Sequence, residues 1–131
     1  MGAGITEVGK KKTLTQTAGE KQVMAIPMSF ETGFQTALKV YFPFAVTINK
    51  IRSVVTKALA NTDAGTITGA NATGASTGGV TTHALSAALA DAKSASPTTN
   101  NAVEADSYYQ LTSAKATAGG EVLVILEYSK R

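Results

Sequence analysis

The fold is decided by the stretch EVLVILEYS, residues 121–129. Its apolar side chains alternate, and a period of two is typical of an extended strand. One face of this strand carries Val122, Val124, Leu126 and Tyr128, and the other carries Leu123 and Ile125. A strand that is apolar on both faces lies in the centre of a sheet or is covered by a partner. Leu123 and Ile125 are therefore candidates for an interface between subunits.

Similar patterns precede this strand along the chain. Residues 34–42 alternate regularly, and residues 46–59 form a long β-branched stretch whose phase slips at Asn49-Lys50, which predicts a β-bulge or a bend. Residues 22–30 contain Pro27, and because proline cannot donate to a ladder, this strand should lie at an edge or bend there. Weaker strands are expected at residues 64–72 and 107–116.

Turn chemistry separates these stretches. We expect turns at residues 61–63 and 117–120, a flexible loop at 73–79 and a polar loop at 91–101. Residues 80–89 favour a strand, and a short helix stays open as the alternative. About eight short strands at a spacing of 8–12 residues, without βα alternation, predict an all-β antiparallel sandwich or barrel.

The first 20 residues differ from the rest of the chain. They are polar, contain four glycines and show no sustained period. We predict an extended N-terminal arm, residues 1–20, followed by one domain, residues 21–131. An arm without a core of its own becomes ordered when a partner holds it.

Composition excludes several classes of protein. The 131 residues include no cysteine, which removes disulfides, thiolate nucleophiles and zinc–cysteine sites. Neither a secretory signal nor an apolar stretch near the ~20 residues of a membrane span is visible. The net charge is +3, and one basic group comprises Lys39, Lys50, Arg52 and Lys57. It is typical of a solvated face, with docking on an acidic surface as the alternative; nucleic-acid binding usually needs a denser cluster.

The residues that could carry chemistry are scattered. His83 is the only histidine, and no Gly-x-Ser-x-Gly elbow accompanies it. Glu104 and Asp106 would share a side of an extended chain, where they could bind calcium or serve glycoside hydrolysis, but a solvated loop is the ordinary interpretation. The glycines form no phosphate loop. We therefore expect no enzyme, no cofactor and no metal.

Aromatic residues offer two further hypotheses. All four phenylalanines, Phe30, Phe34, Phe42 and Phe44, fall in one stretch, which favours a plug of the core over an aromatic ligand groove. Tyr108 and Tyr109 are adjacent, so on a strand they face opposite sides. One of them is then free to anchor an interface, a position where tyrosine is enriched, and we select Tyr108 as the candidate.

The order of segments resembles the small decoration, or cement, proteins and head fibres of tailed-bacteriophage heads. YFPFAVTINKIRSVV, residues 41–55, and NNAVEADSYYQLTS, residues 100–113, carry most of this resemblance, which spans residues 22–130. In similar sequences Gly-Asp often precedes the penultimate strand, whereas this chain has Ala105-Asp106, so that turn is expected to differ.

The resemblance implies a jelly-roll-like sandwich without catalytic activity, located in the virion on the capsid surface and assembled in the host cytoplasm. It implies the major capsid protein as partner, a homotrimer, and an arm that contacts the capsid through residues such as Lys10, Lys11, Lys12 and Leu14. Two alternatives stay open: a carbohydrate- or receptor-binding module of a fibre or spike, and a small glycosidase using Glu104 and Asp106. Sugar sites usually use exposed Trp or Tyr, and this chain has no Trp.

Overall fold

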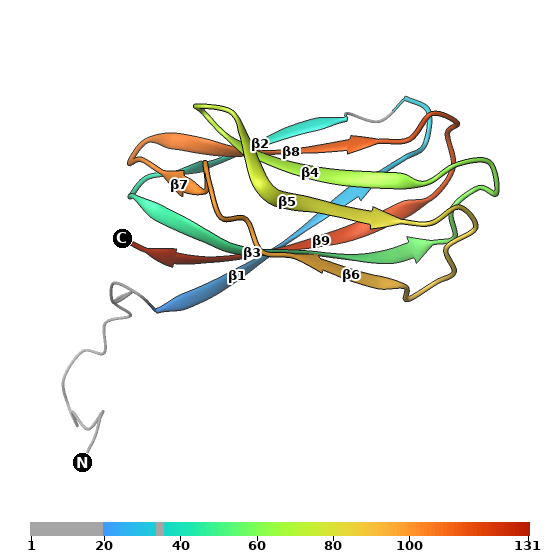
Figure 1. Ribbon diagram of the computed structural model, residues 1–131, viewed down its shortest axis with the longest axis horizontal. Coiled ribbons are helices and arrows are strands. Elements are labelled where there is room, and N and C mark those ends of the chain that lie inside the picture. The colour runs from blue at the N-terminus through green and yellow to red at the C-terminus, as the bar shows by residue number, and fades with distance from the viewer. Residues whose placement is uncertain (1–19, 34–35) are drawn as a thin grey trace, which may run out of the picture.

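Two antiparallel β-sheets pack face to face in the computed structural model, which describes residues 20–33 and 36–131 (Figure 1). The described residues form nine strands and no helix. The strands are β1 (Lys21–Ser29), β2 (Ala37–Phe42), β3 (Val46–Lys57), β4 (Gly65–Asn71), β5 (Ala75–His83), β6 (Ala92–Ala95), β7 (Ala102–Val103), β8 (Ser107–Ala114) and β9 (Glu121–Lys130). The predicted all-β antiparallel sandwich is confirmed.

The strand order is that of a jelly roll. Sheet A runs β1-β9-β3-β6, with the short β7 also paired to β3, and sheet B runs β2-β8-β4-β5. Setting β7 aside, the pairs β1–β9, β2–β8, β3–β6 and β4–β5 are nested inside one another, as if one long hairpin were rolled up. This double-sheet arrangement is one way in which β proteins manage exposed sheet edges.

Sheet A contains the features that the sequence predicted best. Strand β9 lies between β1 and β3, so its central position is confirmed. The register of β3 against β9 shifts between Ile48 and Lys50, which confirms the predicted bulge. Strand β1 is an edge, where Pro27 is tolerated because an edge strand can leave one side of its backbone unpaired.

The Thr- and Gly-rich middle of the chain differs from the prediction. The loop expected at residues 73–79 is wrong, because β5 begins at Ala75. Gly78 adopts a φ of 75° beside a register shift in the β4–β5 pairing, a conformation that suits glycine. Pairing with β4 thus creates a strand that the weak local pattern does not indicate.

Residues 80–89 combine two structures. Val80 to His83 complete β5, in agreement with the favoured strand, but residues 84–90 form turns and are neither strand nor helix. The polar loop expected at residues 91–101 is also partly wrong, because Ala92–Ala95 pair with β3 as β6.

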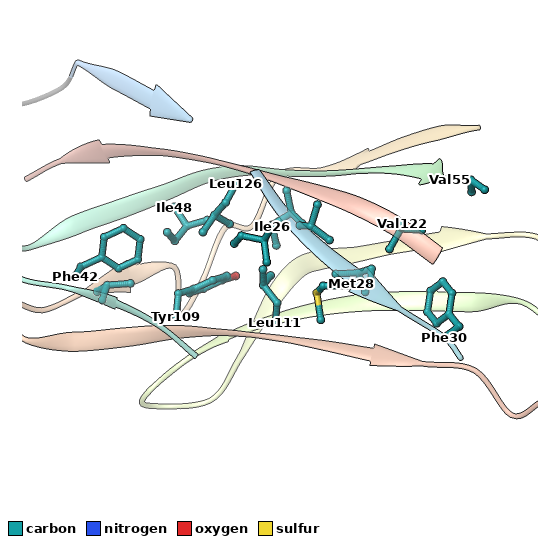
Figure 2. Close-up of a cluster of buried hydrophobic side chains, with 14 of the residues drawn as sticks. Ile26, Met28, Phe30, Phe42, Ile48, Val55, Tyr109, Leu111, Val122 and Leu126 are labelled. Atoms are coloured by element: carbon teal, nitrogen blue, oxygen red, sulfur yellow. The ribbon is translucent and has the colours of Figure 1, made fainter. Parts of the chain in front are cut away.

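The core lies between the sheets and is made of alternating inward side chains (Figure 2). Phe30 and Phe42 are both buried, but they lie toward opposite ends of the cluster in Figure 2, so the single aromatic plug is wrong. Phe44 only packs against the core, and Phe34 lies outside the described residues. Gly69 on β4 leaves the space that the Tyr109 ring occupies.

Candidate functional site

The outer face of sheet A, here called the A face, carries apolar side chains on all three of its long strands. Alternation turns Val122, Val124 and Leu126 into the core, so Leu123 and Ile125 point outward from β9, as predicted. Strand register places them in two rows across the sheet. The rows are Pro27, Leu123, Val54 and Ala92, and Ala25, Ile125, Arg52 and Ser94.

Charge changes along the A face. The next row contains Val23, Glu127 and Lys50, and Val23 is 65% exposed. Lys21 Nζ lies 3.7 Å from Glu127 Oε2, and Arg52 is exposed in the adjacent row. The two apolar rows therefore lie between a cationic end, with three basic side chains and one carboxylate, and Glu121 at the start of β9.

The outer face of sheet B, here called the B face, has a different character. Its outward residues on the two central strands are mostly polar: Thr66, Thr68, Gln110 and Thr112. Tyr41 is 66% exposed and meets Tyr108 edge to face, with ring centroids 5.8 Å apart. Lys39 Nζ lies 4.6 Å from the Tyr108 ring centroid, a cation–π contact. The B face thus offers one small aromatic platform in a threonine-rich surface.

Tyr108 and Tyr109 face opposite sides of β8, as predicted. Tyr109 is fully buried, and its hydroxyl lies 2.7 Å from Ser76 Oγ. Burial is the main cause that raises the pKa of Tyr109. Tyr108 lies on the B face, whereas Leu123 and Ile125 lie on the A face, so the structure does not bring the three predicted interface residues together.

A Ser–His–Asp arrangement is present that the sequence analysis did not find. Ser53 Oγ on β3 lies 2.7 Å from His83 Nε2 on β5, and His83 Nδ1 lies 2.7 Å from Asp91 Oδ2 before β6. Ser53 Oγ also lies 2.8 Å from Thr81 Oγ1. These contacts join the two sheets on the side where β5 approaches β6. The hydrogen bond from His83 is the largest cause that lowers the pKa of Asp91.

Burial separates this arrangement from a hydrolase triad. A nucleophilic serine must reach the substrate, with hydrogen-bond donors beside it to stabilise the developing oxyanion. Ser53 and His83 are 0% exposed, so no substrate can reach the hydroxyl in this structure. The sequence signal was available in part, since Ser53 has the same phase as Ile51 and Val55, and a polar residue at an inward position needs a buried partner.

Other predicted site residues lie apart. Glu104 precedes a turn at Ala105-Asp106, so the extended geometry assumed for the Glu104 and Asp106 pair is wrong. Glu104 lies 3.4 Å from Arg131 Nη1, and Asp106 has a φ of 61°. Within residues 20–33 and 36–131 no group of three or more His, Cys, Asp or Glu side chains could hold a metal ion.

The basic group predicted from sequence is divided among three places. Lys39 lies on the B face, and Lys50 and Arg52 lie on the A face. Lys57 Nζ lies 2.7 Å from Glu31 Oε2, an ion pair that raises the pKa of Lys57 and lowers that of Glu31. The four residues therefore do not form one docking patch. The arm candidates Lys10, Lys11, Lys12 and Leu14 lie outside the described residues.

A polar hollow of about 260 Å³ lies near the β4–β5 turn. Three asparagine amides at its wall donate to backbone carbonyls of the protein: Asn71 to Ala102, Asn100 to Ala75 and Asn101 to Ile48. These amides tie the segment before β7 to the sheets instead of facing a ligand. In the described part of the chain no helix is long and apolar enough to cross a membrane.

Comparison with known proteins gives structural similarities only. No family model and no curated protein matches the chain. A chain of the cyanophage Pam1 capsid asymmetric unit is 17% identical, with a TM-score of 0.49 and coverage of 98% of this chain and 99% of that one. Desmodium yellow mottle tymovirus is 16% identical, with a TM-score of 0.35 and coverage of 94% and 95%. The VP2 subviral particle of infectious bursal disease virus is 11% identical, with a TM-score of 0.36 and coverage of 96% and 37%.

Proposed function

We propose that the chain is a virion structural protein that decorates the outer surface of an icosahedral phage head and stabilises it. The observation that carries the proposal is the apolar centre of the A face, with Leu123, Ile125 and Val54, on a jelly roll. A contiguous apolar area on a protein surface marks a site of contact with another protein. Jelly rolls occur in viral capsid and lectin domains, so the fold is compatible with this role but does not assign it.

In this proposal the A face packs between copies of the chain, which assemble as a homotrimer. Leu123 and Ile125 at its centre are part-buried in the isolated chain and become fully covered in the trimer. Tyr108 is left out of this contact because it lies on the opposite face of the sandwich. If the A face of one subunit packed on the B face of the next without rotation, the subunits would form an open stack. A trimer needs a rotation between neighbouring subunits that closes the ring after three copies.

The arm, residues 1–20, then contacts the major capsid protein, with Lys10, Lys11, Lys12 and Leu14 as contact candidates. Three arms on one trimer bind as a unit, which raises avidity without strong single contacts. A protein that binds only assembled shells stabilises them by mass action, and this is how decoration would strengthen a head. The proposed location is the capsid surface of the virion, after assembly in the host cytoplasm.

The proposal contains no catalytic step. The Ser53 hydroxyl and the His83 ring are inaccessible, and Glu104 and Asp106 lie at a turn. We expect that the Glu104→Ala, Asp106→Ala double variant decorates heads as well as the unaltered chain. Loss of a polysaccharide-cleaving activity in this variant would contradict the non-enzymatic assignment.

Purified heads that lack this protein provide the test. Adding the full chain should produce regular surface density in electron micrographs and raise the temperature at which heads release DNA. A chain that lacks residues 1–20 and begins at Lys21 should keep the circular dichroism spectrum of the sandwich but should not bind. Undiminished binding by this truncation would refute the role of the arm, and absence of binding by the full chain would refute decoration.

A carbohydrate- or receptor-binding module is the second candidate, and one observation favours it. Tyr41 is mostly exposed beside Tyr108 on the B face, and an exposed aromatic ring suits the apolar side of a sugar. A glycan array probed with the full chain should then give hits that Tyr41→Ala removes. An array without hits would dispose of this candidate.

A further inference from the structure

The buried polar chain between the sheets is unusual because its only titratable interior member, His83, has a complete set of neighbours. His83 contacts Ser53 through Nε2 and Asp91 through Nδ1, both at 2.7 Å, and Ser53 continues to Thr81. Ser53 and His83 are 0% exposed, whereas the Asp91 side chain is 32% exposed. The series of hydrogen-bonded side chains thus runs from the protein surface into the core.

The hydrogen-bond partners determine which tautomer the neutral His83 imidazole adopts. An ionised Asp91 only accepts, so Nδ1 must carry the proton that lies between them. Nε2 is then an acceptor, and the Ser53 hydroxyl donates to it. The Ser53 and Thr81 hydroxyl oxygens lie 2.8 Å apart, and with the Ser53 hydrogen directed at Nε2 the Thr81 hydroxyl has to turn and donate to Ser53 Oγ. The opposite tautomer would place two acceptors, Nδ1 and the carboxylate, against each other.

The protonated state can use the same heavy-atom positions. Both ring nitrogens of an imidazolium donate, so Nδ1 still donates to Asp91, while Nε2 now donates to Ser53 Oγ. The Ser53 hydroxyl turns and donates to Thr81 Oγ1. Each of the three contacts keeps one donor and one acceptor; one proton is added at Nε2, and the Ser53 and Thr81 hydrogens turn, so that the Thr81 hydrogen no longer has Ser53 Oγ as its acceptor.

Among the described residues, few other charged groups lie near these hydrogen-bonded side chains. Lys93 on β6 approaches Asp91 Oδ1 at 3.8 Å, and Asp91 is the carboxylate that contacts the imidazole. Strand β3 contributes Ser53, and β4 places Gly65 opposite His83. The hydrogen bond from His83 and then the charge of Lys93 lower the pKa of Asp91, so this carboxylate stays ionised in mildly acidic solution.

We propose that Asp91, His83, Ser53 and Thr81 form a proton-linked lock between the two sheets. A proton taken up by His83 reverses the hydroxyls of Ser53 and Thr81 and leaves every contact of the seam in place. A buried histidine without such partners resists charging, and the fold then weakens in acid. The lock lets this sandwich accept the charge and keep β5 attached to sheet A.

Nitrogen-15 NMR of the full chain tests the tautomer directly, without any variant. At pH 8.5 we expect the neutral His83 ring to carry its proton on Nδ1, and at lower pH we expect the imidazolium with both protons retained. A neutral ring protonated on Nε2 would overturn the proposal, and so would a ring that stays neutral until the protein unfolds.

Thermal unfolding between pH 8 and pH 5.5 tests the role of the carboxylate. Asp91→Asn removes the counter-charge, so we expect its Tm to fall on acidification by about 5 °C more than that of the unaltered chain. Glu104→Gln is the matched control, because Glu104 pairs with Arg131 at the surface, and its pH profile should follow the unaltered chain. Parallel profiles for Asp91→Asn and the unaltered chain would overturn the lock. Should Asp91→Asn fail to fold, the tautomer measurement decides alone.

Discussion

The A face and the B face cover the same core but expose different chemistry. On its central strands the A face exposes Leu123, Ile125 and Val54, whereas the corresponding strands of the B face expose threonine and glutamine. Both inner faces bury apolar side chains, but most of the aliphatic ones come from sheet A, whereas sheet B also buries Ser76, Thr81, His83 and Ser113. The contrast therefore does not come from folding, which needs only one apolar face per sheet.

The difference shows which face carries side chains that folding alone does not require. A solvent-facing sheet position tolerates threonine at little cost to stability, as the B face shows. The apolar residues at the equivalent A-face positions are only part-buried in an isolated chain, so part of each side chain stays in contact with water. They gain importance when another surface covers them.

Placing charges on each face in turn should give the largest contrast. Leu123→Asp with Ile125→Asp puts two carboxylates into the proposed subunit contact, so we expect subunit affinity to fall at least about 100-fold, because burying an unpaired charge is costly. Sedimentation velocity would detect the monomer. Gln110→Asp with Thr112→Asp makes the same change on the central strand of the B face and should leave the oligomer intact. Equal effects on both faces, or a monomeric unaltered chain, would contradict the assignment.

Between the two inner faces, Gly69 tests how tightly sheet B packs against sheet A. A Cβ at Gly69 would meet the Tyr109 ring and lie 2.7 Å from Ile51 Cδ1. Gly69→Ala should therefore lower the free energy of unfolding by about 1–3 kcal/mol. Gly74 has only Asn100 Nδ2 nearby, at 3.5 Å, so urea unfolding of Gly74→Ala should match the unaltered chain. Equal stability of the two variants would contradict this view of the core.

The neighbouring residues Tyr109 and Tyr108 allow an inward and an outward hydroxyl of β8 to be compared for their effect on stability. Tyr109→Phe removes the hydroxyl that contacts Ser76 in the interior, and we expect a loss of about 1 kcal/mol in the free energy of unfolding. Tyr108→Phe removes a hydroxyl on the outer face and should change stability by less. The reverse order in denaturant unfolding would show that the inner hydrogen bond is unimportant.

The smallest effect is expected at the exposed ion pair of Glu31 and Lys57, near one end of the sandwich. Because folding lowers the pKa of Glu31, this carboxylate contributes stability above its unfolded-state pKa, and the contribution is lost as the pH falls through the folded-state pKa. Glu31→Gln should melt slightly below the unaltered chain at pH 7, and the two should converge as the pH falls through the folded-state pKa of Glu31. A gap in Tm that widens in acid would contradict the sign of this effect.

The sequence predicted the parts of the fold that local pattern determines. Period-two alternation identified β9, the phase slip identified the β3 bulge, and Pro27 identified an edge strand. It also indicated that Leu123 and Ile125 face away from the core. These features depend on neighbouring residues along one strand, so no knowledge of the topology was needed.

The remaining features depend on partners distant in the chain. The first half of β5 is rich in small residues, and pairing with β4 makes it a strand. Ser53 meets His83 only because the jelly roll places β3 opposite β5, and Asp91 reaches the ring from a turn that the sequence left undefined. A polar residue at an inward position signals that a partner exists, but the topology decides which one.

The nested pairing also sets an order of folding events. The β4–β5 hairpin closes over a short turn, whereas β1 meets β9 only when Lys21 finds Ser129, near the other end of the described chain. Closing a longer loop costs more chain entropy, so contacts distant in sequence form late and slow the folding of such proteins. The A face requires β1, β9 and β3 together, and a nascent or partly folded chain therefore does not yet present it. Association is in this way postponed until β9 has been synthesised and has paired with β1 and β3.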